Sequence, residues 1–301
     1  MEHHLHPGNN TSGRLLISIL LNGLITLVEI AGGIFSNSLS LISDAIHNLS
    51  DTLALTLAWV ANRVGERKPN AKRTFGYKRF EILSAFINAS ILTAISLYLI
   101  YQGLVRFLHP EPVRSGLMFL IAIIGLFINL ISVIFLHRDS TKSLNVKAAY
   151  VHLLGDTLSS MAVIAGALLI YFTRIVWIDP LLTIIISIVI IVQAYQILRD
   201  SIDILMQTTP RHLNLKEIKT DLELHPFIRN VHHVHCWQLQ DHDILFEAHI
   251  ETSKDLLVSE SGRLVAEIEK LLKEKYRISH TTLQVEFEVC GDKEMIKHQA
   301  G

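Results

Sequence analysis

Six long apolar segments constrain the fold of this 301-residue chain more than any other feature. An α-helix needs about 20 predominantly apolar residues to cross the hydrocarbon core of a bilayer, and each segment reaches that length. The six segments lie at residues 14–35, 39–62, 80–106, 115–137, 145–172 and 177–200. Half of all residues are hydrophobic and the mean hydropathy is +0.38, which is too apolar for an ordinary soluble domain. The chain is therefore predicted to be a multi-pass membrane protein whose spans form an α-helical bundle.

Basic residues lie mainly in the loops on one side of this predicted bundle. The loop after the second segment carries Arg63, Arg67, Lys68, Lys72, Arg73, Lys78 and Arg79. The loop after the fourth segment adds Arg138, Lys142 and Lys147, whereas the loops of the other side carry only Arg106, Arg114 and Arg174. Cytoplasmic loops of membrane proteins carry an excess of Lys and Arg, so the basic loops are expected to face the cytoplasm. An even number of spans then places both the N-terminus and the C-terminus in the cytoplasm.

The last third of the chain is polar and mixed in charge, and it predicts a separate domain. Its pattern favours helices at Asn214–Leu224 and Ser259–Tyr276, and strands at Val231–Gln240, Ile244–Thr252 and Thr281–Val289. This α-β-β-α-β order fits a small open-faced sandwich of the ferredoxin-like kind. The predicted organisation is a cytoplasmic tail at 1–13, a six-span transmembrane domain at 14–208, a cytoplasmic α+β domain at 209–292 and a C-terminal tail at 293–301.

Two His-x-x-x-Asp motifs lie inside the predicted spans. His47 and Asp51 form the first, in the second span, and His152 and Asp156 form the second, in the fifth span. Residues at i and i+4 share one face of a helix, and an ionisable group inside a membrane is costly and usually functional. If the two helices meet, two imidazole nitrogens and two carboxylates form a four-ligand site. That donor set suits a tetrahedral divalent cation such as Zn²⁺.

The charges of this predicted site favour a transported ion. A single buried histidine is usually a packing residue with a hydrogen-bonded neighbour, but a doubled His-Asp pair is harder to explain in that way. Two aspartates and one divalent cation sum to zero charge, which lowers the cost of burying the loaded site. Metal and protons compete for the same ligands, and imidazole titrates near neutral pH. A bundle that exposes the site to either face in turn is expected to exchange protons for metal.

Two other functions also use buried metal ligands. An intramembrane metallohydrolase needs an open metal position and a general base, as in His-Glu-x-x-His, and the chain contains no such sequence. A membrane-anchored metal sensor would need the spans only as an anchor, which leaves the paired intramembrane ligands without a role. Nucleic acid is not an expected partner, because the formal net charge is −1 and no overall basic surface results.

Histidines also cluster in the polar third of the chain. His232, His233, His235, His242 and His249 fall on or between the first two predicted strands. On a regular strand His233 and His235 share one face and His232 lies on the other. Two interpretations stay open: a solvated polar strand, or a metal site to which Cys236, Glu286 and Cys290 also contribute.

Four motifs of this chain resemble those of the cation diffusion facilitator family. They are residues 43–51 around His47, residues 148–156 around His152, the loop 73–79, and residues 232–237. The resemblance covers essentially the whole chain. It implies a six-span metal/proton antiporter that is not an enzyme, that works as a homodimer in the lipid bilayer, and that carries a cytoplasmic metallochaperone-like domain.

The resemblance also assigns roles to individual residues. It implies a transport site made of His47, Asp51, His152 and Asp156, of the branch that prefers Zn²⁺ and also takes Cd²⁺ or Co²⁺. It implies a cytoplasmic regulatory zinc site made of His232, His249 and Glu286. It further implies a charge pair that joins Lys78 or Arg79 to Asp200 or Asp203. The short chain resembles prokaryotic members, so the bacterial inner membrane is the expected location.

Overall fold

The structure is a computed structural model that describes residues 9–65, 67–137, 144–240, 243–288 and 294–296. Within these ranges it describes no side chains for residues 9–19, 21, 55, 58–59, 62, 132, 135–137 and 144–153. The chain divides into two compact units. The helical unit comprises residues 1–60 and 84–198, and the mixed unit comprises residues 61–83 and 199–301.

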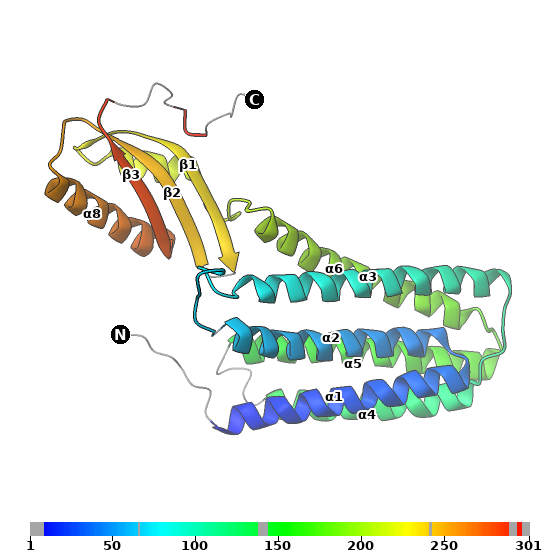
Figure 1. Cartoon of the computed structure of the whole chain (residues 1–301). Helices are drawn as coiled ribbons and strands as arrows, with labels where there is room; N and C mark the ends of the chain where they lie inside the picture. The colour runs from blue at the N-terminus through cyan, green and yellow to red at the C-terminus, as the bar shows by residue number, and fades with distance from the viewer. Residues whose placement is uncertain (1–8, 66, 138–143, 241–242, 289–293, 297–301) are drawn as a thin grey trace. The chain divides into compact units, whose positions relative to one another are not determined.

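The six apolar segments form six long helices, which confirms this part of the predicted fold (Figure 1). They are α1 (Asn9–Ser36), α2 (Leu39–Gly65), α3 (Arg79–Leu108), α4 (Ser115–His137), α5 (Leu144–Thr173) and α6 (Ile178–Leu205). Helix α1 begins at Asn9, five residues before the first apolar segment at 14–35. The sequence has no helix breaker between Asn9 and Arg14 apart from Gly13, whereas Pro7 and Gly8 precede the helix.

The helices differ in how apolar they are. Within the described ranges, α3, α6 and the Leu154–Thr173 part of α5 are long and apolar enough to cross a membrane on composition alone. Asn22–Ser36 in α1 and Ser115–Ile131 in α4 are shorter apolar stretches. Helix α2 is more polar because it carries Asp44, His47, Asn48 and Asp51. Polar residues within a span need partners from neighbouring helices, so α2 is the helix around which the site is to be sought.

Apolar and polar contacts together hold the helical unit. Its apolar core draws on α2, α4, α5 and α6 and consists of Leu41, Met118, Ala122, Val163, Ala167, Ile170, Ile186 and Ile190. Asn22 of α1 donates to Thr52 Oγ1 of α2 over 3.2 Å, and Asn129 of α4 donates to Ser160 Oγ of α5 over 3.4 Å. Such interhelical hydrogen bonds satisfy side chains that lipid cannot solvate.

The mixed unit contains the C-terminal domain, whose element order is the predicted one. Helix α7 (Leu215–Glu223) is followed by β1 (Ile228–Gln240), β2 (Asp243–Thr252), α8 (Val258–Tyr276) and β3 (His280–Glu286). The sheet order is β1-β2-β3, with β1 antiparallel and β3 parallel to β2. Helix α8 is the crossover that a parallel pair requires. Strand β3 ends three residues before the predicted Val289.

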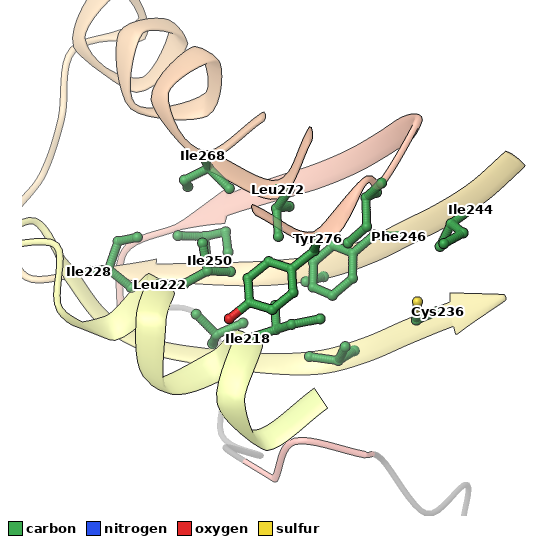
Figure 2. Packing of buried hydrophobic residues seen from close by; sticks show 14 of the residues in the cluster. Ile218, Leu222, Ile228, Cys236, Ile244, Phe246, Ile250, Ile268, Leu272 and Tyr276 are labelled. Atoms are coloured by element: carbon green, nitrogen blue, oxygen red, sulfur yellow. The ribbon is translucent and has the colours of Figure 1, made fainter. Parts of the chain in front are cut away.

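Both helices cover the same face of this sheet (Figure 2). Ile218 and Leu222 of α7 and Ile268 and Leu272 of α8 pack with Phe246 of β2 in one buried cluster. Side chains of a strand alternate between its faces, so the residues between the core positions lie on the opposite, uncovered face. That open face carries the histidines. The fold is therefore an open-faced sandwich, as predicted.

Candidate metal centres

The transmembrane candidate site joins helices α2 and α5. His47 Nε2 of α2 lies 3.2 Å from Asp156 Oδ1 of α5, and His47 Nδ1 lies 3.8 Å from Asp51 Oδ2 one turn along α2. One ligand atom from each of the three residues lies within 4.8 Å of the other two. His47 and Asp156 are only 8% and 1% exposed. The structure thus brings three of the four residues of the predicted site together.

The fourth residue of the predicted site is His152. Its backbone lies in α5 one turn before Asp156, but its side chain is outside the described residues. His152 as a ligand therefore stays a prediction. The three described donors already suit Zn²⁺, because ligand atoms at about 2.0–2.2 Å from a tetrahedral zinc lie roughly 3.3–3.5 Å from one another. The His47 Nε2–Asp156 Oδ1 distance of 3.2 Å is already close to that spacing, and all three ligand atoms lie within 4.8 Å of one another.

Further polar residues surround the site and connect three helices. Asp44 of α2 accepts hydrogen bonds from Ser159 Oγ at 2.5 Å and Ser160 Oγ at 3.2 Å, both in α5. Glu29 of α1 is fully buried and accepts a hydrogen bond from Asn48 Nδ2 of α2 at 2.8 Å. Neither acid belongs to the group of converging ligand atoms. Their contacts fix α2 against α5 and α1, which orients the face that carries His47 and Asp51.

Asp179 is a structural residue that the sequence analysis missed. Its carboxylate, at the start of α6, accepts hydrogen bonds from the first backbone N–H groups of α2: Leu39 N at 2.9 Å and Ser40 N at 3.2 Å. It also accepts from Ser38 Oγ at 2.6 Å. A carboxylate is favourable at a helix N-terminus because it satisfies the free N–H groups and the helix dipole. The signal in the sequence was the Ser-Asn-Ser turn, which offers no acidic cap of its own.

The cytoplasmic candidate site lies on the open face of the sheet. His232 of β1 and His249 of β2 are directly paired across the two strands, and β3 adds Glu286. His249 Nδ1 lies 2.7 Å from Glu286 Oε1, and His232 Nε2 lies 3.5 Å from Glu286 Oε2. One ligand atom of each residue lies within 4.8 Å of the others. Adjacent strands are held about 4.8 Å apart, so three successive strands give this triangle a fixed size.

The donor atoms of this site fit a metal ion. His232 Nε2, His249 Nδ1 and Glu286 Oε2 are buried, and none makes a hydrogen bond of normal geometry to any part of the chain that the structure describes. Burial lowers the pKa of His232, against the opposing effect of Glu286. A lowered pKa favours the neutral imidazole, which is the form that binds metal. Buried donor atoms that converge without hydrogen bonds are the arrangement a cation would satisfy.

The expectation that His232 faces away from His235 is wrong, whereas the rings of His233 and His235 do lie close together as expected. A register shift between His232 and His235 marks a β-bulge, and His233 takes a positive φ of 53° within it. His232 and His235 therefore lie on the same face, and the extra residue His233 stacks between neighbours. Its ring centroid is 4.5 Å from that of His249 and 5.2 Å from that of His235. A bulge adds one residue to a strand and moves the following side chains to the other face.

The interpretation in which Cys236 contributes to this metal site is also wrong. Cys236 points into the hydrophobic cluster (Figure 2). Burial raises the pKa of its thiol to about 12, so the metal-binding thiolate is disfavoured. Cys290 and His242 lie outside the described residues.

The predicted charge pair of Lys78 or Arg79 with Asp200 or Asp203 is not found among the described residues, and two other contacts occur instead. Lys78 Nζ lies 2.5 Å from Asp243 Oδ2 at the start of β2. Asp200 and Asp203 at the end of α6 instead pair with Arg211, at 3.4 and 2.5 Å. The choice of partner depends on the path of the loops, which the sequence pattern does not fix.

Comparison with known proteins agrees with this architecture over nearly the full length. Residues 15–206 match the family model of the cation efflux transmembrane domain, and residues 210–288 match that of the cytoplasmic domain of cation efflux proteins. The chain belongs to the cation efflux family, which is the cation diffusion facilitator family that the four motifs resemble. The family-level prediction is thus confirmed, together with a membrane helical domain and a cytoplasmic C-terminal domain.

Curated relatives are similar over almost the whole of both chains. The zinc transporter ZitB of Pectobacterium atrosepticum is 37% identical over 301 residues, which cover 99% of this chain and 92% of the relative. The metal cation efflux system protein CzcD of Cupriavidus metallidurans is 35% identical, covering 98% and 92%. A cadmium, cobalt and zinc/H(+)-K(+) antiporter of Bacillus subtilis is 38% identical, covering 96% and 93%. These likenesses establish a cation efflux protein of the membrane.

Proposed function

We propose that this protein exports Zn²⁺ from the cytoplasm in exchange for protons, through a site formed by His47, Asp51, His152 and Asp156. The observation that carries the proposal is the convergence of His47, Asp51 and Asp156 from two buried helices. The relatives named as zinc transporters, and the one named for cadmium, cobalt and zinc, support Zn²⁺ as the substrate and Cd²⁺ or Co²⁺ as further substrates.

The proposed exchange follows from charge. Two aspartates and one divalent cation are neutral together, so the loaded site is the form with the least uncompensated charge inside the bundle. When the ion leaves, the carboxylates and imidazoles take up protons, which restores a low net charge. Because the ligands belong to two helices, a movement of α5 relative to α2 would open the site to one face at a time. The relative named as an H(+)-K(+)-coupled antiporter supports a counter-ion in this exchange.

The direction of export depends on the orientation of the chain. We propose that both termini face the cytoplasm of a bacterium and that the bundle crosses the inner membrane. The basic residues between α2 and α3 support this orientation through the positive-inside rule. Helix α2 then presents its polar N-terminus, capped by Asp179, to the opposite side of the membrane.

We also propose that His232, His249 and Glu286 bind a regulatory Zn²⁺ and that the protein is a homodimer through its cytoplasmic domain. The converging donor atoms on the open face support the metal site. A bound ion would tie β1, β2 and β3 together and thereby stiffen the face of the domain that no helix covers. Membership in a family with this cytoplasmic domain supports the dimer.

Two rival functions receive less support from the geometry. A metallohydrolase needs a general base beside an open metal position, whereas both acidic neighbours of the site, Asp44 and Glu29, accept hydrogen bonds from helix side chains. A metal sensor with a passive anchor would not need ligands buried on both α2 and α5.

The test is zinc flux in proteoliposomes with an imposed pH gradient and with the internal pH recorded. We expect zinc uptake to depend on the gradient and to move protons in the opposite direction. Zinc flux that neither depends on nor changes the pH gradient would refute the exchange. Hydrolysis of a peptide or ester without zinc flux would favour the enzyme instead.

A further inference from the structure

A cavity of about 800 Å³ opens within the mixed unit, and none of the residues that line it belongs to a candidate metal centre. Its walls come from the last turn of α2, the α2–α3 loop, the first turns of α3, the end of α6 and two residues of β1, Trp237 and Leu239. The volume is that of a cavity for a small organic molecule, since such sites measure about 300–1,000 Å³. Neither the proposed transport path nor the proposed regulatory site uses any of these residues.

The cavity carries a strong positive charge. Its basic residues are Arg67, Lys72, Arg73, Lys78 and Arg79, and none of the described residues that line it is acidic. Lys78 is paired with Asp243, but the structure gives the other four no ion pair with any described carboxylate. The Nε atom of Arg79 is buried and makes no hydrogen bond with the described residues. Four cations around one cavity repel each other unless an anion lies between them.

One of the basic groups, Arg73, is held by an aromatic residue. The guanidinium of Arg73 lies over the ring of Tyr77, 4.3 Å from its centroid. A cation held in this way keeps its hydrogen-bond donors available for an anion. Phe75 and Trp237 add further aromatic surface to the lining. The arrangement therefore presents several oriented donors in an apolar frame.

The remaining lining is apolar and belongs to the ends of spanning helices. Phe80 and Leu83 lie in the first turns of α3, and Leu205 is the last residue of α6. Both helices are long and apolar enough to cross a membrane. The chain itself thus places the cavity within about two turns of the hydrocarbon boundary, where lipid headgroups lie. A ligand here would contact both basic side chains and the apolar ends of two helices.

We propose that this cavity binds the phosphate headgroup of an anionic phospholipid, with Arg67, Lys72 and Arg73 as its main phosphate contacts. Arg and Lys clusters next to a span attract anionic lipids, and Arg binds phosphate through paired N–H donors. Phe80, Leu83 and Leu205 would contact the glycerol and the first methylenes of the acyl chains. A soluble phosphate compound would use the cations but would gain nothing from these apolar residues. The inference does not depend on zinc transport.

The test is native mass spectrometry of the full-length protein with phosphatidylglycerol or phosphatidylcholine added at equal concentration. We expect phosphatidylglycerol to be retained in preference to phosphatidylcholine. The double variant Arg67→Gln with Arg73→Gln should bind phosphatidylglycerol about 30-fold more weakly, because each cation near an anionic lipid contributes roughly fivefold. The double variant Arg67→Lys with Arg73→Lys keeps the charge and should retain most of the binding, which separates lost charge from lost folding.

A control is Arg263→Gln, which removes one positive charge from the exposed surface of α8, half the charge that the double variant removes. It should leave phosphatidylglycerol binding unchanged. Equal retention of the two lipids, or equal phosphatidylglycerol binding by the wild type and the Gln double variant, would overturn the proposal. Glycerol 3-phosphate and inorganic phosphate are added in a second series. If they bind as tightly as phosphatidylglycerol, the cavity is a site for a soluble anion and the lipid assignment is wrong.

Discussion

The two candidate metal centres use the same kinds of ligand but differ in charge and in the elements that hold them. The described transmembrane ligands are one histidine and two aspartates on helices α2 and α5, whereas the cytoplasmic ligands are two histidines and one glutamate on three paired strands. With a divalent cation the former sum to zero and the latter to +1. A neutral loaded site costs less to bury inside a membrane bundle than a site that keeps a net positive charge.

The two centres also differ in the interactions that hold their ligands in place. Hydrogen bonds along β1, β2 and β3 fix the distances between His232, His249 and Glu286. The transmembrane ligands depend on side-chain contacts between helices, such as those of Asp44 with Ser159 and Ser160. Side-chain contacts between helices can be broken and remade in a movement, whereas sheet pairing cannot be changed one residue at a time. This difference supports the proposal that the helices bind the transported ion and that the sheet binds the regulatory ion.

The largest expected effect is on the number of zinc ions that the protein binds. Asp51→Asn removes one anionic ligand from the transmembrane centre and should abolish zinc binding there, while the cytoplasmic centre still binds. His232→Ala should do the reverse, and the combination of both changes should abolish binding at both centres. Equilibrium dialysis of the full-length protein measures this. A single change that empties both centres would show that they are not independent.

The next effect concerns affinity at the cytoplasmic centre. His232→Ala should lower its zinc affinity by more than about 100-fold, because loss of an outer-shell partner alone lowers affinity about 10–100-fold. Zinc flux at saturating zinc should persist, since the transmembrane ligands are unchanged. Competition with a chelating dye gives the affinity, and proteoliposome uptake gives the flux. Complete loss of flux would mean that the cytoplasmic centre takes part in transport itself.

A third change separates packing from chemistry in the helical unit. A Cβ added at Gly125 of α4 would lie 2.3 Å from Glu29 Oε1, so Gly125→Ala must displace this buried carboxylate. We expect a loss of roughly 1–3 kcal/mol in the free energy of unfolding, as for other overpacked cores. Gly116→Ala on the same helix meets no atom within 4 Å and is the matched control. Thermal unfolding in detergent measures the stability of both variants. An equal loss of stability in Gly125→Ala and Gly116→Ala would contradict the account.

A fourth change tests the assignment of Cys236 to the core. Cys236→Ala should leave zinc affinity unchanged and should lower the free energy of unfolding by about 1 kcal/mol, as for other small deletions from a core. Zinc titration and chemical unfolding give the two quantities. Weaker zinc binding at the cytoplasmic centre would mean that the thiol is a ligand after all.

The smallest effect is a pH dependence in the cytoplasmic domain. Hydrogen bonds from Lys275 and Tyr276 of α8 lower the pKa of Asp221 in α7. A carboxyl whose pKa is lowered on folding contributes stability above its ordinary pKa of about 3.9, and this contribution is lost as the pH falls through the lower folded value. Asp221→Asn should speed hydrogen exchange in α7 and α8 at pH 6. A difference from the wild type that grows as the pH falls below 4 would have the wrong sign.

Much of the fold could be predicted because the sequence patterns are strong. Long apolar segments gave the six helices, and alternating residues gave the three strands in the right order. Three features of the fold were not predicted, and they share one cause. Each depends on the path of a loop or on an irregularity in a strand. The bulge at His233, the cap that Asp179 provides for α2 and the pairing of Lys78 with Asp243 all join residues far apart in sequence or break a regular period.

The candidate centres could be predicted only where their residues lie close together in the sequence. His47 and Asp51 lie one helical turn apart, so their common face followed from the spacing alone. The approach of Asp156 from another helix required the tertiary fold, which periodicity does not specify. Cys236 was misassigned because a strand period read through the bulge cannot tell which face a residue takes.

The most direct measurement is zinc uptake into inside-out membrane vesicles, with an imposed pH gradient and with the internal pH recorded. Wild-type protein is compared with Asp156→Ala, and Asp243→Ala, which lies outside the helical unit, serves as a control for expression and insertion. The account predicts gradient-driven zinc uptake with proton release in the wild type and in the control, and neither in Asp156→Ala. Equal uptake by wild type and Asp156→Ala would show that the His47, Asp51 and Asp156 centre is not the transport site.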